Sequence, residues 1–243
     1  MTEALYFLDC YLTEFEATVK KVADGKFVVL DRTAFYPESG GQPGDTGKLV
    51  RESDGAEFEL LYAGRFNGEI SHEIAGENVS AGLKAGDKVK GFIDWDRRYR
   101  HMRMHTATHV IANVIEKEAG AQITGNQLSL DQSRVDFSLE TFDRDKFAEY
   151  EKIANDLIAR NNPVNFYLVS RKEAEKKLSR LTTLAKGFSD EIKEVRMVEI
   201  EGVTIEACGG THVKNTGEIK SIKITKLQNK GKSNRRMYFT LED

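Results

Sequence analysis

The chain has 243 residues, of which 40% are hydrophobic and 31% charged, and its formal net charge at pH 7 is −3. This composition is typical of an ordinary globular protein. The N-terminus lacks the basic and apolar segments of a secretory signal, and no apolar run approaches the roughly 18 residues of a membrane span. Two cysteines, Cys10 and Cys208, are too few for a disulfide framework, which favours a reducing compartment. We therefore expect a cytoplasmic protein with no membrane contact and no obligate protein partner.

Residues 1–94 are predicted to be mostly β-structure. Residues 15–22 alternate between apolar and polar, Asp24-Gly25 is a turn signal, and residues 26–30 return as a second strand. Further short β-prone runs follow at 58–62 and 89–93, and such a series predicts a small barrel or sandwich. Residues 39–47, with the sequence SGGQPGDTG, are too rich in glycine for a strand and are predicted to form a loop.

From Trp95 onward the pattern changes to helices followed by strands. Residues 97–118 contain neither Gly nor Pro and are followed by Gly120, which predicts a helix and its end. A second helix is expected at about 143–160, and Ser170 with Glu173 gives the capping box of a third. Strands are expected at 195–201, 203–207, 219–227 and 237–241. This order predicts an α+β protein, with a barrel-like domain at 1–94 and a mixed domain with an antiparallel sheet at 95–243.

Basic residues are distributed unevenly. Residues 1–90 carry 10 Lys/Arg against 16 Asp/Glu, whereas residues 219–241 carry seven basic residues and no acidic one. A second basic group begins at Arg97, just before a run of histidines. Basic clusters suit a phosphate backbone, although a run of charge is often only a solvated face.

Histidine and cysteine residues gather in two short segments. His101, His105 and His109 are spaced to lie along one face of the predicted helix, and residues 208–212 read CGGTH. Two histidines four residues apart, a thiolate and another imidazole can complete tetrahedral zinc coordination. His101 and His109 are about 12 Å apart along a helix axis, too far to share an ion, so the spacing allows either 101/105 or 105/109.

The two segments resemble the paired metal-binding motifs of alanyl-tRNA editing domains. Residues 105–109 read HTATH, residues 134–137 read RVDF, and residues 31–42 read DRTAFYPESGGQ, all similar to that family. The resemblance covers nearly the whole chain. The editing domain of threonyl-tRNA synthetase has related motifs, but the surroundings of Cys208 and residues 33–47 favour the alanyl family. Because nothing resembles an ATP-dependent activation domain, we expect a free-standing, medium-length member.

The resemblance implies hydrolysis of the ester bond in mischarged Ser-tRNA(Ala), and also in Gly-tRNA(Ala), while Ala-tRNA(Ala) is spared. It implies one Zn²⁺ per chain held by His105, His109, Cys208 and His212. Thr33 and Cys208 are the predicted catalytic residues, with Thr33 as the partner of the serine hydroxyl. The predicted contacts to the substrate and to mischarged tRNA(Ala) are Thr33, Gly40, Gly41, Arg97, Arg98, His101, Lys230, Lys232, Arg235 and Arg236.

Other interpretations stay open. The chain can be a non-catalytic tRNA-binding module with a structural zinc, or a threonyl-type editing deacylase. Residues 40–42, GGQ, are also found in release factors, but that interpretation leaves the His and Cys clusters without a role. Zinc can supply hydroxide or can orient the amino acid while another water attacks, and four protein ligands favour the orienting role.

Overall fold

The computed structural model describes residues 2–75, 82–140, 143–178 and 193–243. The chain divides into two compact units, Met1–Arg100 (unit 1) and His101–Asp243 (unit 2). The predicted boundary at residue 94 lies at the start of helix α1 (Trp95–Ala119), and the division between the units falls inside this helix. Within the described ranges, none of the helices is long and apolar enough to cross a membrane.

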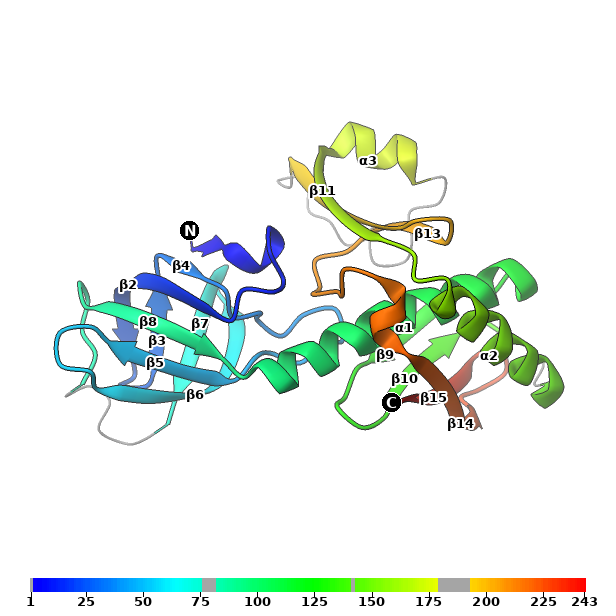
Figure 1. The fold of residues 1–243 in the computed structure, drawn as a ribbon, viewed down its shortest axis with the longest axis horizontal. Helices are drawn as coiled ribbons and strands as arrows, with labels where there is room; N and C mark the ends of the chain where they lie inside the picture. Colours follow the sequence, from blue (N-terminus) through cyan, green and yellow to red (C-terminus); the bar gives the residue numbers. More distant parts are fainter. Residues whose placement is uncertain (1, 76–81, 141–142, 179–192) are drawn as a thin grey trace. The chain divides into compact units, whose positions relative to one another are not determined.

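Unit 1 is built on a closed antiparallel barrel of six strands, as predicted, in the order β2-β3-β7-β6-β5-β8 (Figure 1). The short strands β1 (Glu3–Ala4) and β4 (Arg32–Thr33) pair in parallel, and the 3-10 helix η1 (Leu5–Phe7) directly follows β1. The barrel strands are β2 (Glu14–Ala23), β3 (Phe27–Leu30), β5 (Gly47–Arg51), β6 (Glu57–Phe66), β7 (Glu69–Ile74) and β8 (Lys88–Ile93).

The alternation of apolar and polar residues along the strands produces the core of the barrel. Phe15, Ala17 and Val19 of β2 are buried, whereas the intervening residues are more exposed, so every second side chain of this strand enters the core. The turn from β2 to β3 uses Asp24 and Gly25 with φ of 48° and 69°, a backbone conformation that favours the Asp-Gly sequence found there. These local features explain why the first hairpin could be predicted.

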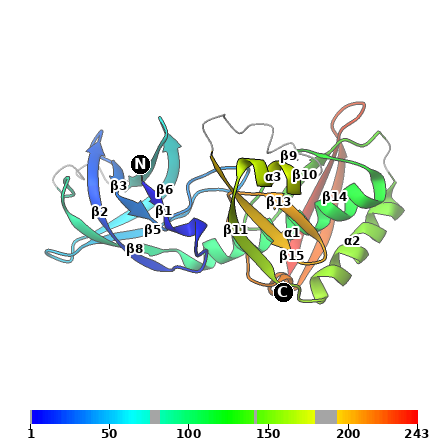
Figure 2. The same cartoon turned by 90° about the horizontal axis from the view of Figure 1, so that it is seen from above.

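The described residues of unit 2 form two antiparallel sheets, the helices α2 (Arg144–Ala159) and α3 (Arg171–Lys177), and most of α1 (Figure 2). The four-stranded sheet has the order β14-β15-β10-β9, and the three-stranded sheet the order β11-β12-β13. Their strands are β9 (Ile123–Gln127), β10 (Ser133–Phe137), β11 (Val164–Ser170), β12 (Glu194–Ile200), β13 (Thr204–Ala207), β14 (Ser221–Asn229) and β15 (Arg235–Glu242). A 3-10 helix, η4 (Thr216–Ile219), precedes β14.

The local sequence explains where the helices of unit 2 begin and end. The side chain of Asp143 caps α2, and Ser170 and Glu173 form the predicted capping box of α3. Gly120, with φ of 67°, follows the last residue of α1, as expected for a helix end. Asn155 of α2 exchanges two hydrogen bonds with the Ile222 backbone, 2.8 and 3.0 Å long, which fixes α2 along the edge strand β14.

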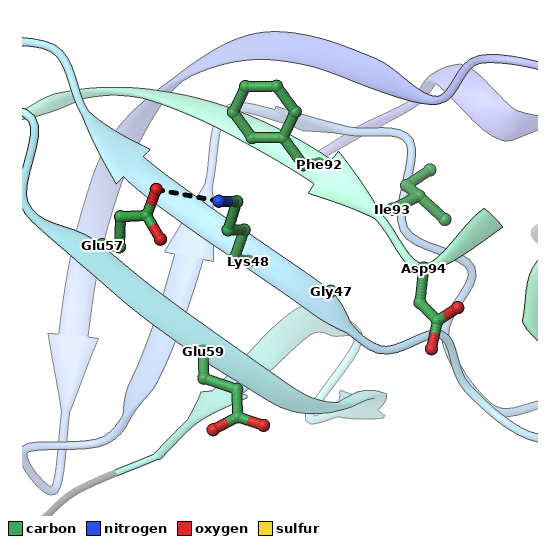
Figure 3. A pocket seen from close by; sticks show the side chains of 7 residues that line it. All are labelled: Gly47, Lys48, Glu57, Glu59, Phe92, Ile93 and Asp94. Carbon is green, nitrogen blue, oxygen red and sulfur yellow. Dashed lines mark hydrogen bonds and ion pairs between the residues drawn. The ribbon is translucent and has the colours of Figure 1, made fainter.

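Unit 1 also carries a surface pocket of about 520 Å³, formed by residues of β5, β6 and β8 (Figure 3). Two of its charged side chains, Lys48 and Glu57, form an ion pair at 2.8 Å. Glu59 and Asp94 add two carboxylates to the rim. The predicted site residues are not among those that line this pocket.

Candidate metal centre

Two of the three predicted histidines lie side by side on α1. His105 and His109 are one helical turn apart, and their rings stack with centroids 5.1 Å apart and planes inclined by 16°. Both side chains are buried, although imidazole is a polar group. Two adjacent polar rings in a buried position require polar partners.

Those partners come from the turn after β13. Cys208 and His212 are both buried, and the Cys208 thiol lies 3.3 Å from His212 Nε2 and 3.6 Å from His105 Nε2. The His212 ring centroid is 4.3 Å from that of His105 and 5.0 Å from that of His109. The ligand atoms of all four residues lie within 4.8 Å of one another.

Arg196 of β12 holds the turn in place. Its Nη1 donates to the carbonyl oxygens of Cys208 and Gly210, both at 2.9 Å, and its guanidinium carbon lies 4.6 Å from the centre of the Phe166 ring. The N–H of Gly210 points at the Cys208 sulfur at 3.4 Å. The thiol is therefore placed by a buried arginine and by the local backbone rather than by a flexible loop.

The outer nitrogen atoms of two rings have hydrogen-bond partners. His109 Nδ1 lies 3.0 Å from a carboxylate oxygen of Glu206, and His212 Nδ1 lies 3.2 Å from the Thr106 hydroxyl. That hydroxyl donates to the Met102 carbonyl at 2.9 Å, so its oxygen accepts from the His212 N–H. Both rings are thus fixed with Nδ1 turned outward, which directs Nε2 into the cluster.

The surroundings also set the proton affinities of the cluster. Burial opposes ionisation of the Cys208 thiol, but attraction to His105 and His212 holds its pKa well below the usual range. Burial and repulsion from His105 hold the pKa of His212 well below its usual value. Burial would lower the pKa of His109 too, yet the Glu206 carboxylate and Cys208 together outweigh burial and raise that pKa well above normal.

The donor set fits a tetrahedral metal ion. Bonds of about 2.0–2.3 Å in tetrahedral geometry place ligand atoms roughly 3.3–3.6 Å apart, close to the two distances from the Cys208 sulfur. His109 Nε2 is buried and has no hydrogen-bond partner in the part of the chain that the structure describes. A metal ion would satisfy this atom, and one thiolate with three imidazoles suits a borderline-soft divalent cation.

Comparisons with known proteins place the chain in a family. A family model described as the second additional domain of threonyl and alanyl tRNA synthetases matches residues 195–238, and a class II (A) tRNA synthetase model matches residues 8–97. The chain is 88% identical over 243 residues to the alanyl-tRNA editing protein AlaX-M of Methanosarcina barkeri, and both chains are covered completely. The chain belongs to the AlaX-M family of alanyl-tRNA editing proteins.

More distant relatives agree with this membership. An AlaX-M protein of Saccharolobus solfataricus is 42% identical, again over the full length of both chains. An alanine–tRNA ligase of Pyrobaculum aerophilum is 40% identical over 236 residues, which cover 93% of this chain and 25% of the ligase. The resemblance to the alanyl-tRNA editing family, inferred above from short motifs, is confirmed.

In this AlaX-M member, the predicted residue Thr33 is fully buried in unit 1. Its hydroxyl oxygen lies 2.9 Å from His72 Nε2 and accepts the Phe35 N–H at 3.1 Å. The nearby Gly40 and Gly41 have φ of 59° and 83°, and Gly40 is exposed with nothing within 4 Å of where a Cβ would stand. Their positive φ favours glycine at both positions, and at Gly40 the reason is backbone conformation and not lack of space.

The basic residues before the histidines have structural partners. Arg98 is fully buried, forms an ion pair with Asp45 and donates to the Ala34 and Cys10 carbonyls at 2.6 and 3.0 Å. Arg97 donates to the Gly44 carbonyl at 3.2 Å. Contact with tRNA stays a prediction for both arginines. The burial of Arg98 disfavours such a contact for that residue.

The four predicted basic contacts near the C-terminus differ in whether they already have partners within the protein. Lys230 and Lys232 are exposed in the loop between β14 and β15. Arg235 is buried and donates to backbone carbonyls, including that of Gly231 at 2.8 Å, and Arg236 binds Asp136 through two contacts of 2.6 and 2.8 Å. As predicted tRNA contacts, the two lysines are the better candidates because their charges face solvent.

His101 is also buried, and it does not belong to the group of four ligand atoms. Three residues that hold the cluster from outside, Glu206, Thr106 and Arg196, were not predicted from the sequence. Of the three, only Glu206 could have been identified from the sequence. It lies two positions before Cys208 in a segment predicted to be extended, where alternate side chains point to the same face.

Proposed function

We propose that this protein is a trans-acting aminoacyl-tRNA deacylase that hydrolyses the ester bond of mischarged Ser-tRNA(Ala), and also Gly-tRNA(Ala), and leaves Ala-tRNA(Ala) intact. The observation that carries the proposal is the full-length identity of 88% to a protein named for alanyl-tRNA editing. The reaction adds water across the ester, so the amino acid regains its carboxylate and the ribose oxygen of the tRNA regains its proton. Its proposed location is the cytoplasm.

We further propose Zn²⁺ as the ion, one per chain, held by His105, His109, Cys208 and His212. Three imidazoles and a thiolate are typical zinc ligands, and the depressed pKa of Cys208 favours the thiolate that such an ion requires. When bound, zinc supplies a positive charge that orients the amino acid and polarises its ester carbonyl. The chain itself contributes a buried, preformed set of ligands whose outer nitrogens are already fixed by Glu206 and Thr106.

Selection against alanine requires more than a roomy pocket, because serine is larger by one hydroxyl. A group that hydrogen-bonds this hydroxyl is left unpaired by alanine, which is the stronger form of discrimination. Thr33 is our proposed partner for the hydroxyl. Its oxygen, already bonded to His72 and to the Phe35 N–H, has one acceptor position left. Backbone groups of Gly40 and Gly41 are proposed to meet the tRNA terminus.

One observation favours a competing function. Four protein ligands, all buried, are typical of a closed structural zinc site, whereas catalytic zinc usually keeps an open position. A tRNA-binding module with such a zinc would bind the same tRNA and leave its ester intact. The two functions therefore differ in chemistry and not in binding.

The deciding experiment is deacylation by the purified chain of four substrates: Ser-, Gly- and Ala-tRNA(Ala), and Ser-tRNA(Thr). We expect rapid hydrolysis of the first two and little of the others. Tight binding of Ser-tRNA(Ala) without hydrolysis would support the binding module. Preferred hydrolysis of Ser-tRNA(Thr) would instead support a threonyl-type deacylase.

A further inference from the structure

Strand β13 brings two functional side chains to one face. Ala207 points into the cluster of apolar side chains packed around α3, so its neighbours Glu206 and Cys208 turn to the opposite side. There Glu206 pairs across the strands with the buried Val198 of β12, whose other neighbour in register is Phe166. The carboxylate is therefore delivered to the metal centre by the same strand that leads into the thiol.

Glu206 is itself held in place and largely buried. Its side chain is 13% exposed, and that of His109 is 6% exposed. One carboxylate oxygen lies 3.0 Å from His109 Nδ1, and the other accepts the Thr204 hydroxyl at 3.2 Å. Because a carboxylate only accepts hydrogen bonds, the proton must sit on Nδ1, so Nε2 is the nitrogen whose lone pair can bind an ion in the cluster.

The charge of the centre makes the position of this carboxylate significant. A divalent ion bound by one thiolate and three neutral imidazoles carries a net charge of +1, and all four ligands are buried. An unbalanced charge in a buried site is costly, and a carboxylate one imidazole away from the ion reduces that cost. Glu206 is the carboxylate in that position.

We propose that Glu206 is a positioning residue of the metal centre, which fixes the ring of His109 and balances the charge of the bound divalent ion. It thereby sets the affinity of the chain for that ion. This inference rests on the metal site of the proposed function but not on its deacylase activity. Outer partners of this kind commonly change metal affinity by 10- to 100-fold.

The test is the dissociation constant of Zn²⁺ from the full chain, measured by competition with a chromophoric chelator. Glu206→Ala removes both the hydrogen bond and the charge, so we expect binding roughly 10- to 100-fold weaker. Glu206→Gln keeps an acceptor oxygen of the same reach and loses only the charge, and should give a smaller loss. Glu194→Gln, at an exposed carboxylate of β12, is the matched control and should bind as the wild type does.

A second measurement separates positioning from general stability. In ¹⁵N-histidine spectra of the zinc-loaded wild type, His109 should carry its proton on Nδ1, and Glu206→Ala should lose this fixed signature. The proposal is overturned if Glu206→Gln and Glu206→Ala both bind Zn²⁺ as tightly as the wild type, or if the wild type binds none. Should the alanine variant fail to fold, the glutamine variant decides. Wild-type protein that binds Zn²⁺ but hydrolyses no aminoacyl-tRNA would refute the proposed function alone.

Discussion

The hydroxyl oxygen of Thr33 lies 2.9 Å from Nε2 of His72, and both side chains are fully buried in unit 1. His72 Nδ1 lies 2.9 Å from the Val28 carbonyl, which only accepts, so the proton of the ring sits on Nδ1. Burial lowers the pKa of His72 to about 4, which keeps the ring neutral at physiological pH. His72 Nε2 must therefore accept the Thr33 hydroxyl proton, and Thr33 can offer any further group only an acceptor.

Because Thr33 can only accept a hydrogen bond from a further group, the effect of Thr33→Val can be predicted. If Thr33 accepts a hydrogen bond from the serine hydroxyl, kcat/KM for Ser-tRNA(Ala) should fall roughly 5- to 150-fold, equivalent to about 1–3 kcal/mol. Gly-tRNA(Ala) lacks the hydroxyl and should be hydrolysed nearly as before. The same change leaves His72 Nε2 and the Phe35 N–H without a partner, so the free energy of unfolding should also fall by about 1–3 kcal/mol.

Parallel deacylation assays on the two substrates, with urea unfolding alongside, check this prediction. Equal losses on both substrates would show that Thr33 only supports the barrel. An unchanged rate on both would place serine recognition elsewhere.

His72 should make unit 1 sensitive to acid. The pKa of His72 is about 4 in the folded chain, against the 6.5 of an unperturbed histidine. Between pH 6.5 and 4 the unfolded chain therefore binds a proton at this residue and the folded chain does not, which stabilises the unfolded chain. The free energy of unfolding should thus be constant above about pH 7 and fall by about 3 kcal/mol as the pH drops to 4. Trp95, the single tryptophan of the chain, lies in unit 1 and reports its unfolding in urea by fluorescence.

The control for this titration is His72→Gln, which cannot titrate in that range. The wild type and the variant should differ most near pH 7 and converge towards pH 4. Parallel pH profiles for the two proteins would show that other groups cause the acid sensitivity.

Replacement of the metal ligands should remove the ion. His105→Ala or His109→Ala deprives the cluster of one imidazole, so zinc content should drop from about one per chain, and Ser-tRNA(Ala) deacylation should drop with it. His101→Ala is the matched control on the same helix and should retain zinc. Elemental analysis of the three purified variants decides, and loss of zinc from His101→Ala with retention in His109→Ala would favour the 101/105 pair.

Lys230 and Lys232 should contribute to tRNA affinity. Their charges are exposed, whereas Arg235 and Arg236 already bind backbone carbonyls and Asp136. Reversal of both lysines to Glu should weaken tRNA binding and reduce its dependence on salt, by a slope of about 0.7–0.9 for each phosphate that is no longer neutralised. Binding constants measured across a salt series test this, with reversal of the exposed Lys20 and Lys88 as control. An unchanged slope would identify the two lysines as an ordinary solvated face.

The sequence by itself determined the elements whose cause is local. The Gly- and Pro-free run became α1, the alternation after residue 14 became β2, and Ser170 with Glu173 capped α3. Each of these depends on periodicity or on residues a few positions apart, which the covalent chain fixes. Motif resemblance determined the family, because two five-residue segments 103 positions apart carried the same metal-binding pattern.

Only the tertiary structure decided which side chains meet. Strand β11 was not predicted, and it pairs with β12 on the far side of α3 in the chain. Strands β5, β7, β9 and β10 were not predicted either, although each pairs with a neighbour along the chain, because their local patterns were weak. The histidine spacing allowed two pairs, the family resemblance implied 105/109, and in the fold His105 and His109 lie with Cys208 and His212 whereas His101 does not. Likewise Arg98, a predicted tRNA contact, forms an ion pair with Asp45 inside unit 1, and Glu206 of β13 contacts His109 of α1. Charge and hydrogen-bonding capacity are properties of a residue, but whether they face solvent, a substrate or a buried partner is a property of the fold.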